Sequence, residues 1–139
     1  MSHYTSTYSI PDRRPGDPGY YKPVTKIPEN GGNMQKTYKA VFSVGVGKDK
    51  NNFSIPFSVA LENRQTAISY AAGLFGGVTV TENFGGWNDN GFLVTEESWA
   101  FIVVSDKRDK FREFGNYLKD LYNQSAVLLA VTEVESEFI

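Results

Sequence analysis

The segment that decides the fold runs from Leu74 to Asp106 and reads LFGGVTVTENFGGWNDNGFLVTEESWAFIVVSD. Two glycines, Gly76 and Gly77, follow an apolar stretch and are typical of a helix end. Residues 78–84 and 92–104 alternate between apolar and polar side chains, which is the pattern of half-buried β-strands. Residues 85–91 are rich in Gly and Asn and predict a turn. We therefore expect a helix end followed by two strands that are neighbours in the sequence.

The flanking sequence completes a fold with two helices and four strands. Residues 37–46 alternate as a first strand, and residues 59–74 carry an apolar stripe at helical spacing. A second helix is indicated by the spacing of Phe111, Phe114, Leu118, Leu121 and Tyr122. Residues 126–134 are apolar on both faces, so we expect a last strand in the centre of the sheet. The order βαββαβ predicts an α+β, ferredoxin-like sandwich.

The first 35 residues differ from the rest of the chain. Five of its six prolines lie there, with four tyrosines and almost no aliphatic residues. Such a composition cannot bury enough apolar surface to offset the entropy of ordering. We expect a flexible Pro/Tyr-rich arm over residues 1–35 and one ferredoxin-like domain over residues 36–139.

Composition excludes several function classes. The net charge of −2 gives no support for nucleic-acid binding. The chain has no cysteine and a single histidine, His3, so thiolate chemistry, histidine-rich metal sites and histidine-based triads are not expected. No apolar run approaches the roughly 20 residues of a membrane span, and no signal peptide is evident. We expect a cytoplasmic protein that needs no metal and no cofactor.

Two adjacent carboxylates, Glu96 and Glu97, stand where the strand over 92–104 begins. In a regular strand they point to opposite faces, so they do not form a glycosidase-like pair around one bond. One of them is a candidate to hold a cationic or hydroxyl-bearing ligand. The alternative is a solvated strand edge, where carboxylates are common.

Glycines and a tryptophan supply the other candidates. Gly76 and Gly77 are expected to cap a helix whether or not they also bind a ligand. The amides freed by such a turn could also bind a carboxylate. Trp87 lies in a polar Gly/Asn-rich stretch with little structural reason to be apolar, so it is a candidate to stack on a ring or a cation. The sequence Gly45-Val46-Gly47-Lys48 lacks the rest of a phosphate loop and is better explained as a strand end.

These residues resemble a known family. The elements Leu74 to Val78, Gly86-Trp87, Thr95-Glu96-Glu97, Asp106-Lys107 and Gln124 to Leu128 follow, in order, the pattern of the phage S-adenosylmethionine lyases. The resemblance covers about residues 74–128. Trp87 stands where that family usually has an aromatic residue of the tyrosine type.

The resemblance implies a PII-like trimer that binds S-adenosylmethionine between subunits. It further implies cleavage of this substrate to methylthioadenosine and homoserine lactone. In that interpretation Glu96, or else Glu97, fixes the substrate's ammonium or ribose hydroxyl. Main-chain groups at Gly76, Gly77 and Val78 orient the attacking carboxylate, and Trp87 contacts the adenosine.

Two other interpretations remain open at the level of sequence. A PII-like trimer could bind or sequester a nucleotide-like metabolite without turnover, since fold alone does not decide function. Alternatively, the tyrosine-rich arm could carry a protein-interaction function. Both the lyase and the binding module predict a homotrimer, and we expect Tyr38, Phe42 and Trp99 to lie on an exposed sheet face that needs a partner.

Overall fold

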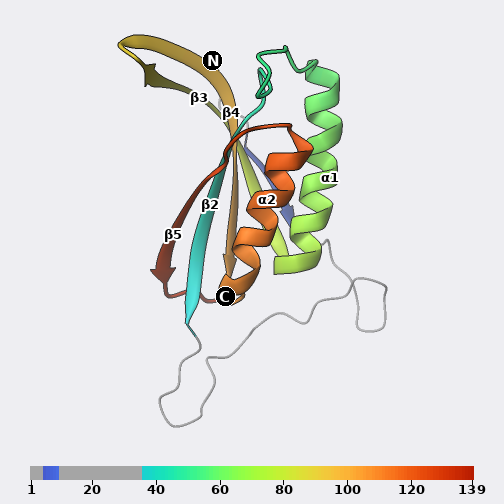
Figure 1. Ribbon diagram of the computed structural model, residues 1–139. Coiled ribbons are helices and arrows are strands. Elements are labelled where there is room, and N and C mark those ends of the chain that lie inside the picture. Colours follow the sequence, from blue (N-terminus) through green and yellow to red (C-terminus); the bar gives the residue numbers. More distant parts are fainter. Residues whose placement is uncertain (1–4, 10–35) are drawn as a thin grey trace.

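The computed structural model describes residues 5–9 and 36–139. This part of the chain forms two layers, a five-stranded antiparallel sheet with both α-helices on one of its faces (Figure 1). The elements in chain order are β1 (Thr5–Ser9), β2 (Thr37–Gly45), α1 (Phe57–Phe75), β3 (Gly77–Asp89), β4 (Phe92–Ser105), the short 3-10 helix η1 (Arg108–Lys110), α2 (Phe111–Leu121) and β5 (Leu128–Val134).

The sheet order is β1-β3-β4-β2-β5. Its last four strands, with α1 and α2 as the two crossovers, are connected as βαββαβ with the first and last strands side by side. This is the ferredoxin-like arrangement, so the predicted α+β fold class is confirmed.

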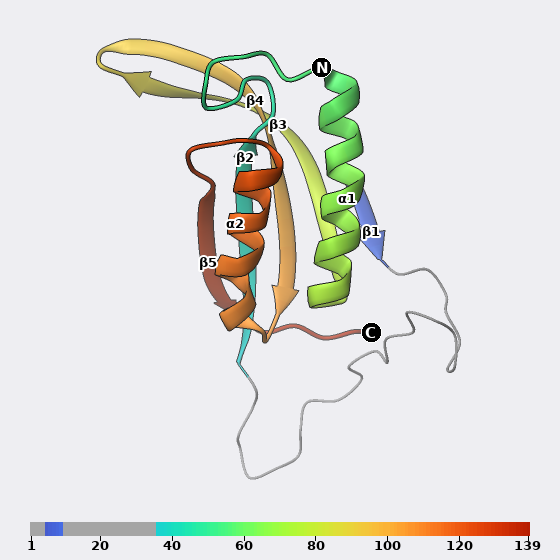
Figure 2. The ribbon, with the colours of Figure 1, turned by 45° about the vertical axis from the view of Figure 1, so that its right-hand side comes forward.

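One strand was not predicted from the sequence. Residues Thr5–Ser9, within the segment expected to be an arm, form β1 and pair antiparallel with the start of β3, at the edge of the sheet (Figure 2). Its residues alternate Thr and Ser with few apolar side chains, so no hydrophobic pattern marks it. The rest of the expected arm lies outside the described residues.

The strands β3 and β4 form a hairpin that is longer than predicted. Residues 85–89 belong to β3 and pair with Phe92 to Glu96, so the predicted turn over 85–91 was wrong. The connection consists of Asn90 and Gly91 alone, both with positive φ. Asn-Gly is the usual sequence of a two-residue hairpin turn because both residues tolerate that backbone conformation. The hairpin end extends beyond the helices (Figure 1).

The hydrophobic core lies between the sheet and the two helices. Ala40, Phe42 and Val44 of β2 are fully buried, and the ring of Phe42 packs against that of Phe114 of α2, with 4.9 Å between the ring centroids. On β4 the residues of the same face are Trp99, Phe101 and Val103, all buried. The alternation seen in the sequence thus marks the helix-covered face of the sheet.

The expectation that Tyr38, Phe42 and Trp99 lie on an exposed face was therefore wrong. Phe42 and Trp99 are buried, and the ring of Tyr38 packs edge-on against Phe111 at the start of α2. All three aromatic residues are therefore on the side of the sheet that the helices cover.

The position of β5 also differs from the prediction. It lies at an edge of the sheet, paired only with β2, and not in the centre. Leu129 and Val131 pack on the core, whereas Leu128 and Ala130 on the other face are exposed. Apolar residues on both faces indicated a central strand, but here half of them face away from the helices.

Replacement of Phe114 by Ala should destabilise the protein by about 3–5 kcal/mol, as typical for a phenylalanine lost from a packed core. Phe114 is fully buried and contacts the rings of Phe42, Tyr70, Phe75, Phe101 and Tyr117. Phe92→Ala is the matched control because Phe92 is 76% exposed at the hairpin end. Denaturant unfolding would measure the stability of both variants, and equal losses of stability would contradict the described core.

Candidate functional site

Glu96 and Trp87 lie together on the face of the sheet that the helices leave uncovered. In the register of β3 with β4, Gly85 pairs with Glu96 and Trp87 pairs with Val94. Trp87 and Glu96 are thus diagonal neighbours on one face, within reach of side chains of their size. Trp87 is 48% exposed and Glu96 is half-buried. The two side chains can contact one ligand.

A glycine lies beside the Glu96 carboxylate. Gly45, the last residue of β2, pairs with Ser98, two residues along β4 from Glu96. A Cβ atom at Gly45 would stand 3.1 Å from Oε2 of Glu96 and 3.5 Å from Oε1. The carboxylate therefore occupies the space that a side chain at position 45 would need.

Glu97 is on the opposite face. It pairs with Phe84, it is exposed, and its backbone carbonyl accepts a hydrogen bond of 3.1 Å from the amide of Val46. The register thus separates the two adjacent carboxylates, as a regular strand predicts. Within one subunit only Glu96 shares a face with Trp87.

The predicted glycine pair is far from these residues. Gly76 is the left-handed C-cap of α1 and donates its amide hydrogen to the Ala72 carbonyl at 2.9 Å, which confirms the predicted helix end. Gly77 begins β3, and Val78 is buried on the helix-covered face. Trp87 is ten positions after Gly77 along β3, a distance of about 33 Å at ~3.3 Å per residue. The structure does not bring the two groups together within one chain.

On the covered face, Trp99 takes part in a structural contact network. The Arg64 guanidinium lies 4.6 Å from the centre of the Trp99 ring and forms a 2.7 Å ion pair with Glu82. Tyr122 packs edge-on against Trp99 and donates its hydroxyl hydrogen to the Ala60 carbonyl at 3.2 Å. Burial raises the pKa of Tyr122, and the nearby Arg64 opposes that rise. These groups connect α1 to the sheet and leave Trp87 as the accessible tryptophan.

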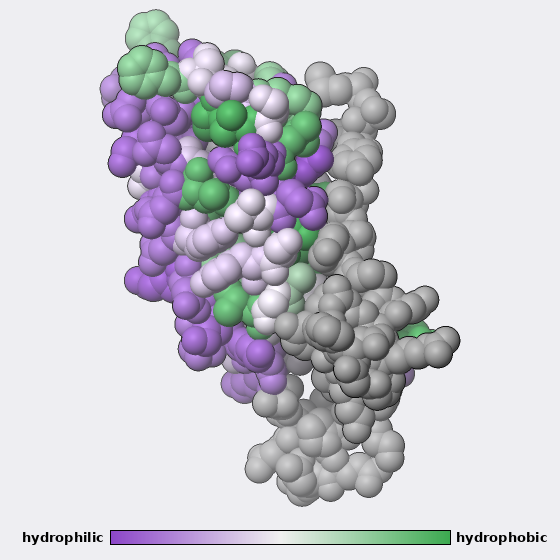
Figure 3. Space-filling view, turned by 90° about the vertical axis from the view of Figure 1, so that its right-hand side faces the viewer, coloured by the Kyte–Doolittle hydropathy of each residue, from purple (hydrophilic) through white to green (hydrophobic). Residues whose placement is uncertain are grey.

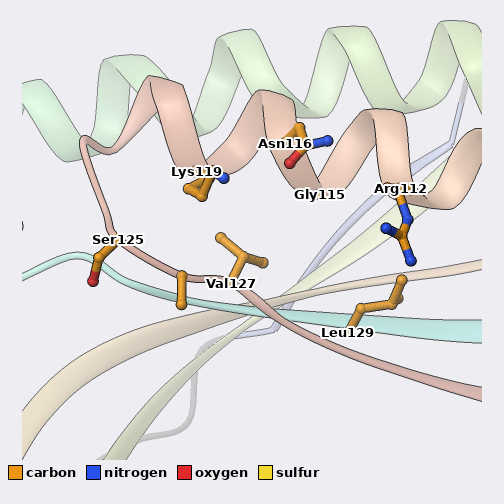
Figure 4. A pocket seen from close by; sticks show the side chains of 8 residues that line it. Arg112, Gly115, Asn116, Lys119, Ser125, Val127 and Leu129 are labelled. Atoms are coloured by element: carbon orange, nitrogen blue, oxygen red, sulfur yellow. The ribbon is translucent and has the colours of Figure 1, made fainter.

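A shallow groove of about 340 Å³ lies elsewhere, between α2 and the start of β5 (Figure 4). Arg112 and Lys119 come from the helix, and Val127 and Leu129 come from the facing segment. None of the residues predicted for the site lines it. On the side that carries α1, hydrophobic residues form small separate patches among hydrophilic ones (Figure 3).

Metal and membrane features were also sought in residues 5–9 and 36–139. This part of the chain contains no cluster of His, Cys, Asp or Glu that could hold a metal ion. Neither of its α-helices combines the length and apolar character that crossing a bilayer requires.

Comparisons with known proteins address the fold. No family model matches the chain, and no curated protein matches it. Seven chains of known structure do. A phage SAM (S-adenosylmethionine) lyase in the apo state aligns with a TM-score of 0.51 and 23% identity, covering 73% of this chain and 83% of the lyase. A phage SAM lyase in complex with S-methyl-5'-thioadenosine aligns at 0.50 and 23%, covering 70% and 81%.

This chain has the fold of phage SAM lyase. CutA from Synechococcus elongatus also aligns, with 13% identity over 73% of this chain and 79% of CutA, but its TM-score of 0.48 is too low to support an argument. The fold shared with SAM lyase agrees with the resemblance seen in the sequence. At 23% identity it establishes the architecture, and the activity has to be argued from the site.

Sequence reasoning did not identify the residues that lie around Glu96 in the fold. Gly45 was interpreted as a strand-end glycine, and its contact with Glu96 depends on strand pairing between residues about 50 positions apart in the chain. Gln124, whose side chain binds the Gly45 carbonyl, was noted only within the family pattern. No local pattern predicts either contact.

Proposed function

We propose that this protein is a SAM lyase that forms methylthioadenosine and homoserine lactone. One observation carries the proposal: Glu96 and Trp87 share the uncovered sheet face of a chain with the fold of phage SAM lyase. The bound molecule in one of those lyases, S-methyl-5'-thioadenosine, is the thioether product expected of this reaction. SAM carries an ammonium group and an aromatic base, and a carboxylate beside an indole matches both features.

The reaction needs little from the protein beyond orientation. An oxygen of the substrate's own carboxylate forms a bond to the methylene carbon of the amino-acid chain that is attached to sulfur. The bond between this carbon and sulfur breaks. Its electron pair goes to the sulfonium, which leaves as a neutral thioether, so no proton is transferred. Well-oriented intramolecular reactions gain about 7–11 kcal/mol over unrestrained ones. A site that folds the substrate into attack geometry is therefore sufficient.

In this proposal Glu96 holds the substrate's ammonium or ribose hydroxyl. A carboxylate placed directly against the sulfonium would stabilise the ground state more than the transition state, because the positive charge is lost as sulfur leaves. Glu96 should therefore fix the substrate at a distance from sulfur. Trp87, next to it on the same face, contacts the adenosine.

We further propose that the site lies between subunits of a homotrimer. Gly76 and Gly77 are about 33 Å along β3 from Trp87 by strand geometry, too far for one small ligand to contact both within one chain. A neighbouring subunit can supply main-chain groups near Gly77 to the substrate carboxylate, whereas the Gly76 amide is already bonded to the Ala72 carbonyl. The uncovered sheet face also favours association, because Val41 and Ile102 are partly exposed on it and Val104 is 46% exposed.

The adjacent glutamates provide a matched test. Glu96→Gln should lower SAM turnover by about 10- to 100-fold, because a hydrogen bond to a charged group contributes about 1.5–3 kcal/mol and 1.36 kcal/mol is tenfold. Glu97→Gln, one residue away on the other face, should change it by less than about threefold, since exposed charges contribute less than ~1 kcal/mol. Product chromatography measures turnover, and circular dichroism checks the fold.

Equal effects of the two substitutions would contradict the assignment of Glu96. SAM that binds in calorimetry but is never cleaved would instead place the protein among non-catalytic modules that sequester a nucleotide-like metabolite.

Light scattering should give a mass three times that of the single chain. Ile102→Lys puts a charge in the middle of the uncovered face and should dissociate the trimer, because a buried unpaired ammonium is costly. Gln65→Lys, on the exposed side of α1, is the control and should leave the trimer intact. A monomeric wild-type protein with full turnover would contradict a site between subunits.

A further inference from the structure

The end of β2 is held by a side-chain amide. Nε2 of Gln124 donates hydrogen bonds to the carbonyl of Gly45 at 2.9 Å and to the carbonyl of Lys48 at 2.7 Å. Gln124 lies between α2 and β5, far from β2 in the sequence. One residue thus fixes both sides of the turn that follows β2.

The sheet provides no strand partner for Gly45 on the β5 side. The ladder between β2 and β5 ends at the pair Ser43 and Leu128, so no residue of β5 pairs with Gly45. The amide of Gln124 takes the place of the missing strand partner. A carboxylate or an apolar side chain could not replace this partner, because the carbonyls of Gly45 and Lys48 both require a hydrogen-bond donor.

Gln124 is itself firmly anchored. Its backbone amide donates to the Lys119 carbonyl at 2.9 Å, and the preceding residue, Asn123, has a positive φ of 50°. The backbone carbonyl of Asn123 accepts a hydrogen bond from the amide of Lys50 at 2.8 Å. The side-chain amide of Asn123 donates a hydrogen bond to Oδ2 of Asp49 at 3.2 Å. The corner after α2 and the turn after β2 therefore form one hydrogen-bonded unit.

This unit ends at the candidate site. Gly45 lies beside Glu96, and a Cβ on Gly45 would be 3.1 Å from Oε2 of that carboxylate. The carboxylate occupies the space left by the missing side chain of Gly45, so we expect the path of the backbone there to limit where the carboxylate can lie. Reacting groups misplaced by 1 Å can lose about 100-fold in rate.

We propose that Gln124 is a positioning residue that holds the Glu96 carboxylate in place through the backbone of Gly45. The effect on catalysis rests on the function proposed above. The effect on the carboxylate itself does not, and can be measured without substrate. Gln124 itself contacts neither the substrate nor Glu96 in the proposed arrangement.

The test compares Gln124→Met, which keeps the length of the side chain and removes the donor, with Gly45→Ala, which keeps the Gln124 amide and crowds the carboxylate. The first readout is the NMR resonance of the Glu96 carboxyl carbon, assigned with Glu96→Gln. It should shift in both variants. Asn63→Leu is the control, because it also removes an amide-to-carbonyl bond, to Leu121, in another part of the fold. In Asn63→Leu the resonance of the Glu96 carboxyl carbon should not shift.

The second readout is turnover of SAM in a double-mutant cycle. Gln124→Met should lower kcat/KM about tenfold in the wild-type protein and by less than about twofold in Glu96→Gln, since residues that act through one another are not additive. An unmoved Glu96 resonance in Gln124→Met would overturn the inference, whatever Gly45→Ala does. Equal losses of turnover in the two backgrounds would overturn it as well. A wild-type protein that leaves SAM intact would contradict the proposed function only, and the resonance would still decide the role of Gln124.

Discussion

The pairing of β4 with β3 on one side and β2 on the other is the constraint on which the rest of the structure depends. β4 is the middle strand of the sheet, and its register decides which face each of its residues occupies. A slip of one residue would move Trp99 out of the core and exchange Glu96 with Glu97. The buried side chains of Trp99, Phe101 and Val103 specify the register, because a slip would expose all three. The core thus determines which glutamate can meet a ligand on the uncovered face.

Much of this fold could be predicted from hydrophobic periodicity. The alternation of Ala40, Phe42 and Val44 and the helical spacing of Phe111, Phe114 and Leu118 identify core-facing residues, and all six are buried. Their faces were harder to assign, because a strand pattern shows that one face is apolar without showing what covers it. For this reason Phe42 of β2 was expected to meet another subunit, although it packs against Phe114 of α2.

Other errors have separate physical causes. The hairpin end contains Gly85, Gly86 and Asn88, residue types that usually end strands, yet pairing with the opposite strand keeps them extended. The Asn90-Gly91 signal for a two-residue turn was present in the sequence, and giving it more weight would have predicted the full length of the hairpin. β1 has no apolar pattern and is identified only by its pairing with β3. For the site, the opposite faces of Glu96 and Glu97 followed from strand geometry, whereas the contacts with Gly45 and Gln124 depend on the tertiary fold.

The proposed chemistry is consistent with a small site that has few catalytic side chains. A substrate that carries its own nucleophile and its own leaving group needs to be held in one conformation and kept from water. Glu96, Gly45 and Gln124 are suited to holding, since the carboxylate lies beside a fixed strand end. The same fold could equally serve a protein that binds SAM without cleaving it. Whether bound SAM is cleaved is therefore the decisive observation.

The most direct measurement is to incubate the purified protein with SAM in water enriched in the heavy isotope of oxygen and to identify the products by mass spectrometry. We predict methylthioadenosine together with homoserine lactone that carries no heavy oxygen, because the substrate's own carboxylate forms the new bond. SAM that remains intact, or homoserine with heavy oxygen in its hydroxyl group, would contradict it.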